Sequence, residues 1–134
     1  MSDDAKGERE WRFYVDDMIG FAEKILIFTA GMDQDDFVAS GLTYDATLRN
    51  LELIGEAATH IPDEIRRAHP EIPWRLIIAT RNHLIHGYLG IDDDIVWSLV
   101  QDDIPVLLRK LQEISSMMIQ PACGELRTAP KWHE

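Results

Sequence analysis

The sequence predicts an all-α fold in a single domain. Apolar residues recur three and four positions apart along most of the chain, which is the period of an amphipathic helix. No stretch of useful length alternates apolar and polar residues as a half-buried strand does. At 134 residues, 46% of them hydrophobic, the chain has the size of one ordinary domain that closes its core without disulfides or metals. We expect four to five main helices with short extra helices between them.

Two long helices with a short helix between them are expected in the first half of the chain. The first runs over residues 8–30 and ends at Gly31, and the short helix covers 33–39. The second long helix runs over 42–61, where Pro62 ends it. Its apolar face carries Leu48, Leu51, Ile54, Ala58 and Ile61, and its polar stripe carries Asp45, Arg49, Glu52 and Glu56.

The second half of the chain is expected to hold one short and two longer helices. Pro62 suits the first position of a short helix over 62–68, and a proline-rich turn then leads to a helix over 74–88. The last helix, over 92–119, contains Pro105, which should kink or split it near residue 102. The apolar seam of this helix is Val96, Val100, Ile104, Leu107, Leu111, Ile114 and Met118.

Composition excludes several classes of protein. No apolar run is long enough to cross a bilayer, and the acidic N-terminus lacks the basic and apolar parts of a secretory signal, so we expect a cytoplasmic protein. The lone Cys123 predicts neither an internal disulfide nor a zinc site. Residues 1–120 are expected to form the domain, and residues 121–134, which show no periodicity, are expected to form a mobile tail.

The formal net charge of −11 argues against a general nucleic-acid coat protein, because phosphate binding draws most of its affinity from Lys and Arg. The charge is unevenly distributed, however. Residues 1–36 hold ten acidic side chains against four basic ones, whereas residues 49–81 hold five of each, and all five bases are arginines. An anionic ligand is therefore expected to meet the middle of the chain.

The stretch ATRNHLIHGYLG places several polar side chains on an otherwise apolar helix. At about 100° per residue, Arg81 falls in the middle of the apolar face, with Tyr88 about 20° away. Asn82 and His86 lie together on the flank of that face, one turn apart, and His83 lies farther round. An arginine cannot lose its proton, so a buried Arg81 needs a carboxylate, a phosphate or a water-filled cleft.

Each of these residues alone also has an ordinary structural explanation. Arg81 can form an ion pair with Glu52 or Glu56 that only joins two helices. His86 alone suits a hydrogen-bonded histidine at a helix end, and Tyr88 alone suits a packing residue whose hydroxyl is bonded. The residue types and their spacing leave these explanations open beside a phosphate-binding site.

The same stretch resembles the Arg-x4-His-x-Tyr motif of HepT toxins, which belong to the HEPN ribonuclease superfamily. Arg81, His86 and Tyr88 match the motif, and Asn82 matches the polar residue that usually follows its arginine. Three further stretches resemble the family's second helix, the lead-in to its motif helix and its last helix: RNLELIGEAA (49–58), IPW (72–74) and IDDDIVWSLVQDDIPVLLRKL (91–111). The resemblance therefore covers most of the chain.

The resemblance implies an antiparallel helical bundle that forms a homodimer, with the two motif helices near the two-fold axis. It implies a toxin with metal-independent endoribonuclease activity, so RNA is the expected substrate, and no cofactor, membrane or DNA partner is expected. The expected protein partner is a nucleotidyltransferase antitoxin of the MntA type, encoded beside the toxin. Such antitoxins silence members of the family by transferring AMP from ATP to the motif tyrosine, which is Tyr88 here.

The motif side chains suit RNA cleavage without a metal ion. An imidazole ordinarily titrates near neutral pH, so His86 can take the proton of a 2′-hydroxyl, while Arg81 can hold the phosphate through two parallel hydrogen bonds. Asn82 can orient the imidazole or a phosphate oxygen, and a second copy of His86 across a two-fold axis can supply the acid. Glu52 and Glu56 can assist Arg81 or merely pair with it. The alternative function is a non-catalytic helical dimer that binds a nucleotide or docks a nucleotidyltransferase.

Overall fold

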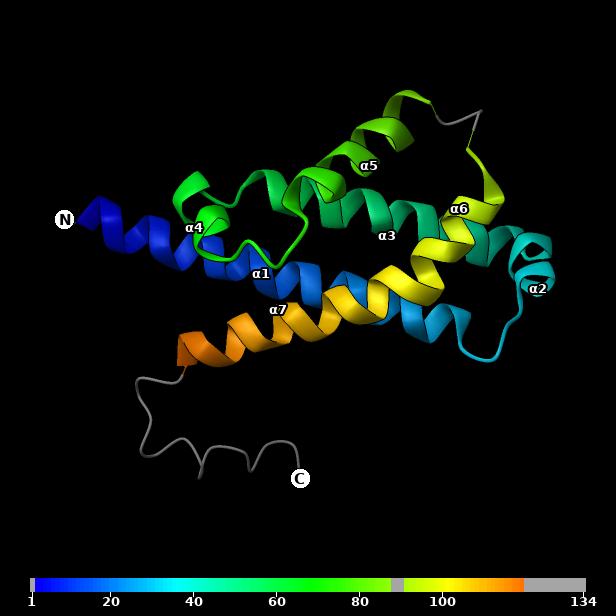
Figure 1. Cartoon of the computed structure of the whole chain (residues 1–134), viewed down its shortest axis with the longest axis horizontal. Helices are drawn as coiled ribbons and strands as arrows, with labels where there is room; N and C mark the ends of the chain where they lie inside the picture. The colour runs from blue at the N-terminus through cyan, green and yellow to red at the C-terminus, as the bar shows by residue number, and fades with distance from the viewer. Residues whose placement is uncertain (1, 88–90, 120–134) are drawn as a thin grey trace.

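The computed structural model describes residues 2–87 and 91–119, and every regular element in these ranges is helical (Figure 1). In chain order the elements are α1 (Ser2–Thr29), α2 (Gln34–Ala39), α3 (Gly41–Thr59), α4 (Asp63–Ala68), α5 (Trp74–His86), α6 (Asp93–Ser98), the π-helical segment η2 (Leu99–Asp103) and α7 (Ile104–Ile119). The all-α prediction is confirmed. The expected tail over 121–134 lies outside the described residues. No helix in the described ranges is long and apolar enough to cross a membrane.

The bundle is built around α1. This helix packs against α3 and against α7, and the chain runs along both neighbours in the direction opposite to α1 (Figure 1). The helix α5 packs mainly against α3, to which it is also antiparallel, so it lies on the outer side of the bundle. The expected antiparallel helical bundle is therefore confirmed.

The helix α1 begins at Ser2, six residues before the predicted start at Glu8. The predicted start was wrong because the sequence before Trp11 carries no apolar period that would reveal a helix. The acidic residues Asp3 and Asp4 still favour a helix start there, because negative charge is stabilised near the positive end of the helix dipole.

The core follows the predicted apolar faces of the later helices. All five residues of the predicted inner face are buried: Leu48, Leu51, Ile54, Ala58 and Ile61. The predicted seam is also buried at Val96, Val100, Ile104, Leu107, Leu111 and Ile114, whereas the side chain of Met118 lies outside the described part. The buried face of α1 adds Trp11, Val15, Met18, Ala22 and Ile25.

Two prolines set helix boundaries. Pro62 is the N-cap of α4 and not its first residue, one position from the prediction. Pro105 lacks the N–H that would bond the carbonyl four residues back. The chain accommodates this in η2, where the N–H of Ile104 donates to the carbonyl of Leu99 in a π-helical pattern. The last helix was predicted to kink or split near Asp102, and the structure has a π-helical segment there that interrupts the α-helix without breaking it.

Tyr44 joins the start of α3 to the start of α6. Its hydroxyl donates to Oδ1 of Asp93 at 2.6 Å, and its ring packs on Phe37 with the centroids 5.3 Å apart. Burial, the hydrogen bond to Asp93 and the charges of nearby aspartates raise the pKa of Tyr44 to about 12. The hydroxyl therefore stays protonated and keeps donating far above neutral pH.

Candidate active site

Arg81 lies on the side of α5 that faces α3, where Gly55 permits a close approach of the two helices. A Cβ at Gly55 would overlap the Cβ of Arg81 and would lie 3.1 Å from the carbonyl oxygen of Ile77. Both of these atoms are fixed to the backbone of α5, so neither can rotate away. Glycine is therefore the residue type that fits here, and its absence of a side chain places the base of Arg81 directly against α3.

The guanidinium of Arg81 is held by two partners. Its Nη2 donates to Oε1 of Glu56 at 2.6 Å, and its Nη1 donates to Oδ1 of Asn82 at 2.7 Å. Its Nε is buried and has no acceptor among the described residues. The side chain keeps 27% of its surface exposed. Arg81 is therefore less buried than a position in the middle of an apolar face implies, and solvent can reach it.

Glu56 is the carboxylate that pairs with Arg81. Glu52 lies one turn earlier on the same polar stripe of α3, but it accepts from Arg49 of its own helix at 3.1 Å. The ion pair between two helices that offers a purely structural explanation of Arg81 is therefore present, and its partner is Glu56.

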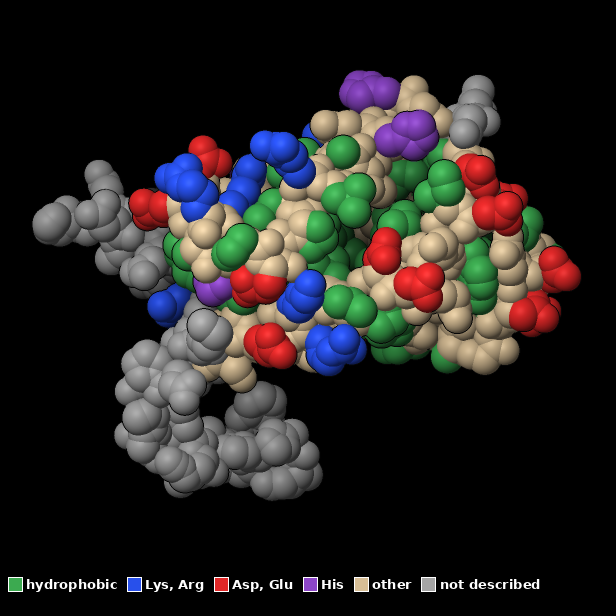
Figure 2. Space-filling view, in the orientation of Figure 1, with side chains coloured by type: hydrophobic (Ala, Val, Ile, Leu, Met, Phe, Trp, Pro, Cys, Tyr) green, Lys and Arg blue, Asp and Glu red, His purple; other side chains and the backbone are tan. Residues whose placement is uncertain are grey.

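His86 and His83 are exposed on α5, and Figure 2 shows histidine side chains on the surface near the end of this helix. His86 follows Arg81 by five residues, which corresponds to about 7.5 Å along the helix and about 140° around it. Within residues 2–87 and 91–119, the imidazole of His86 makes no hydrogen bond or ion pair. Asn82 is bonded to Arg81 and not to an imidazole. One subunit therefore brings Asn82 to the guanidinium but leaves His86 apart from it. Tyr88 lies outside the described residues.

A second contact of Glu56 was not predicted from the sequence. Its Oε2 lies 3.4 Å from Nε2 of His60, and the His60 ring stacks on Tyr14 with the centroids 4.5 Å apart and the planes 11° from parallel. Contacts thus continue from Arg81 on α5 through Glu56 on α3 and His60 at the C-cap of α3 to Tyr14 on α1. The spacing of four residues between Glu56 and His60 is the sequence signal for this contact.

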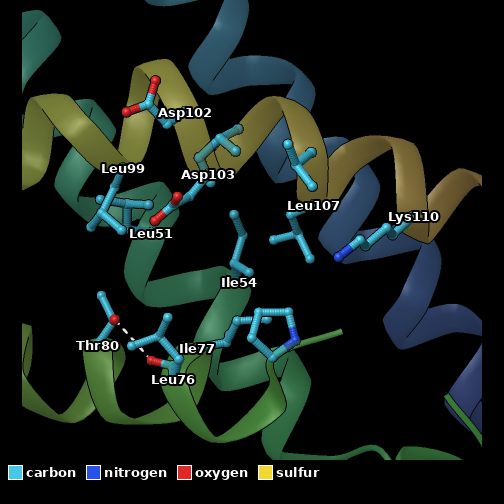
Figure 3. Close-up of a pocket in the computed structure, with 13 residues that line it drawn as sticks. Leu51, Ile54, Leu76, Ile77, Thr80, Leu99, Asp102, Asp103, Leu107 and Lys110 are labelled. Carbon is cyan, nitrogen blue, oxygen red and sulfur yellow. Dashed lines mark hydrogen bonds between the residues drawn. The ribbon is translucent and has the colours of Figure 1, made fainter. Parts of the chain in front are cut away.

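Three hollows border α5. One of about 290 Å³ lies between α3 and Ile91, and it is lined by Leu84 of α5 together with Arg49 and Glu52. An apolar cavity of about 260 Å³ lies between α3, α5 and the η2–α7 segment, and the side chains of Asp103 and Lys110 are directed toward it (Figure 3). An open groove of about 780 Å³ is lined by α4, α5 and the turn between them, and it includes Asn82. Within the described ranges, no three His, Cys, Asp or Glu side chains gather as a possible metal site. Of these hollows, the groove is the one that Asn82 lines.

Known proteins resemble this chain over most of the residues that form the helical structure. A family model described as "Ribonuclease HepT-like" matches residues 18–114. A Thermococcus cleftensis protein named "Probable ribonuclease HepT" is 39% identical over 107 residues, which are 80% of this chain and 97% of that protein. Two Methanocaldococcus jannaschii proteins with RNase in their names are 31% and 32% identical, over 78% and 80% of this chain and 96% and 88% of their own lengths. No solved structure matches the chain significantly.

Proposed function

We propose that this chain, which belongs to the HepT-like ribonuclease family, is the toxin of a toxin–antitoxin pair and cleaves RNA without a metal ion. The observation that carries the proposal is the guanidinium of Arg81, which is oriented by Asn82, paired with a half-exposed carboxylate and open to solvent. A cation held in this way is prepared to bind a phosphate and to stabilise the negative charge that builds on it.

Arg81 can exchange Glu56 for a phosphate at a small cost in free energy. The Glu56 side chain is 48% exposed, and an ion pair in contact with solvent contributes only about 0–1 kcal/mol. A phosphodiester presents two oxygens to the planar guanidinium, so it can accept two parallel hydrogen bonds. Asn82 stays bonded to Nη1 and keeps the guanidinium oriented during the exchange.

His86 is the proposed general base. Its imidazole takes the proton of the 2′-hydroxyl, the 2′-oxygen bonds to the adjacent phosphorus, and the bond from phosphorus to the 5′-oxygen breaks. The departing 5′-oxygen needs a proton from an acid. We assign this proton to a second His86, from the other subunit of a homodimer, because each subunit carries its own His86 about 140° around α5 from Arg81. The products are a 2′,3′-cyclic phosphate and a 5′-hydroxyl.

Tyr88 is the proposed site of silencing by an MntA-type nucleotidyltransferase antitoxin. In this step the phenolic oxygen bonds to the α-phosphorus of ATP, pyrophosphate leaves and the phenolic proton passes to solvent. The attached AMP carries a negative charge only two residues beyond His86 in the chain, so it would compete with RNA for the same cleft. The motif position of Tyr88 supports this assignment. Tyr88→Phe should stay toxic and should escape silencing when the antitoxin is co-expressed.

Expression of the chain alone, with and without single substitutions, tests the nuclease. The wild type should stop growth, and the purified protein should cleave RNA in the presence of EDTA. Arg81→Lys and His86→Ala should each lower cleavage by about 100-fold or more and remove toxicity, because one loses the bidentate contact and the other the base. His83→Ala is the matched control and should keep both. Cleavage that survives in His86→Ala, or that EDTA abolishes, would contradict the proposed chemistry.

The alternative is a non-catalytic helical dimer that binds a nucleotide or docks a nucleotidyltransferase. It is favoured by one observation, since Glu56 already neutralises Arg81. Glu56→Gln distinguishes a ribonuclease from a docking dimer in which the ion pair only joins two helices. In a ribonuclease this change removes the charge that competes with the phosphate, so a non-cleavable RNA should bind several-fold more tightly. In a purely structural pair, RNA binding should not change, and only the free energy of unfolding should fall, by about 0–1 kcal/mol.

A further inference from the structure

The groove along α4 and α5 carries more positive than negative side chains. Arg66, Arg67 and Arg75 line it, and Asp63 is the one acidic residue in its described lining. The chain as a whole has a formal net charge of −11, so the groove departs from the rest of the molecule. Figure 2 shows Lys and Arg side chains over α4 and the start of α5, with Asp and Glu side chains beside them at α4, whereas on this face the end around α2 and α6 shows Asp and Glu without Lys or Arg.

The three arginines differ in their contacts. Arg66 donates to three backbone carbonyls at the end of α3, at distances of 3.0 to 3.4 Å, so it fixes α4 against that helix end. Arg67 and Arg75 are exposed, and neither guanidinium makes a hydrogen bond or ion pair within the described part of the chain. Their guanidiniums are therefore available to an external anion, and their replacement should not disturb the fold.

The groove meets the candidate active site at Asn82. This residue lines the groove and accepts a hydrogen bond from Arg81. Arg75 and Arg81 are six residues apart on α5, which corresponds to about 9 Å along the helix axis. At this separation the two guanidiniums can each contact a different phosphate of one strand.

Trp74 contributes to the wall of the groove and does not form a stacking surface. Its side chain is buried, and its indole Nε1 donates to the carbonyl of His69 at 3.0 Å. The described lining holds no other aromatic ring, so the groove offers charge without a platform for bases. Binding there should depend strongly on salt and only weakly on base identity.

We propose that this groove binds the sugar-phosphate backbone of the RNA strand beside the cleaved bond, with Arg67 and Arg75 each contacting one phosphate. The identity of the ligand rests on the proposed ribonuclease function. The groove gives an acidic protein a local positive surface for a polyanion, and its junction with Asn82 directs the strand to Arg81.

The test measures RNA binding without cleavage, in a His86→Ala background. Binding of single-stranded oligouridine is followed by fluorescence anisotropy at increasing KCl concentrations, with and without the double substitution Arg67→Gln/Arg75→Gln. On a single strand, each lost phosphate contact reduces the slope of log K against log salt by about 0.7, so the double variant should reduce it by about 1.4. The Kd at low salt should rise several-fold.

Lys24→Gln/Arg109→Gln is the matched control, because it removes the same charge from exposed side chains of α1 and α7 that do not line the groove. Its slope should equal that of the parent. An unchanged slope in the groove variant, or an equal reduction in the control, would overturn the inference. An unchanged slope together with lost binding of the nucleotidyltransferase would assign the groove to a protein ligand instead. Cleavage by the wild type, assayed in parallel, reports separately on the proposed function.

Discussion

Replacing Gly55 with alanine should push α3 and α5 apart at the candidate active site. A Cβ at this position would overlap the Cβ of Arg81 and would lie 2.9 Å from its Cγ. Ordinary van der Waals contact begins at 3.4 Å, so the distance to Cγ alone is 0.5 Å too short. The Cβ of Arg81 and the nearby carbonyl oxygen of Ile77 move only with their backbone, so the helices themselves must shift.

The size of the effect follows from two opposing contributions. Forcing a methyl group into a packed interface costs about 1–3 kcal/mol. Alanine is also the better helix former, by about 1 kcal/mol over glycine. Gly20→Ala isolates this second contribution, because a Cβ at Gly20 in α1 meets nothing within 4 Å. We expect Gly20→Ala to raise the free energy of unfolding by about 0.5–1 kcal/mol and Gly55→Ala to lower it by up to about 2 kcal/mol.

Urea denaturation followed by circular dichroism measures both variants. The difference between their free energies of unfolding should be about 1–3 kcal/mol, which is the packing cost alone. RNA cleavage should also separate them, because a displacement of about 1 Å at Arg81 can lower the rate about 100-fold. If Gly55→Ala is as stable and as active as Gly20→Ala, then α3 and α5 do not approach closely here and the reasoning is wrong.

Three further predictions concern stability. The contact of Tyr44 with Asp93 stabilises the fold fully below pH 10.0, and this stabilisation is lost as the pH rises through about 12. Tyr44→Phe should therefore remove the loss of stability at alkaline pH, as measured by urea denaturation. Near neutral pH the same variant should lower the free energy of unfolding by about 1 kcal/mol. Arg66→Ala should lower the free energy of unfolding by about 1–3 kcal/mol, whereas Arg67→Ala should change it by less than about 0.5 kcal/mol, as compared by urea denaturation. Leu111→Ala leaves a cavity at a fully buried position and should lower the free energy of unfolding by about 2–5 kcal/mol. A much smaller loss would contradict the described core.

The helices were predictable wherever one face is buried. The inner face of α3 and the seam of α6, η2 and α7 repeat at helical spacing, and the structure buries them as expected. The start of α1 was not predictable in this way, because a helical segment without an apolar stripe has no periodic signal. Pro105 predicted an interruption of the last helix. The π-helical form of η2 depends on how the flanking turns pack and not on the proline alone.

The contacts of the site were less predictable than its residues. Glu52 and Glu56 lie one turn apart on the same stripe, so their spacing could not select the partner of Arg81. The selection comes from the crossing of α3 and α5, which Gly55 allows next to Glu56. In the sequence, Gly55 has no feature that separates it from any other small residue inside a helix. Its role exists only in the packed pair of helices.

A helical projection overstates the burial of Arg81 because it treats the whole apolar stripe of α5 as covered. In the structure α5 packs mainly against α3, and Ile85 keeps 43% of its surface exposed. Ile85 lies about 40° from Arg81 around the helix, on the side of Asn82 and His86. An exposed apolar side chain between a phosphate-binding group and a base suits the apolar part of a subunit interface. A second subunit that covers Ile85 would bring its own His86 toward Arg81, so the exposed part of the stripe supports the homodimer that the proposed mechanism requires.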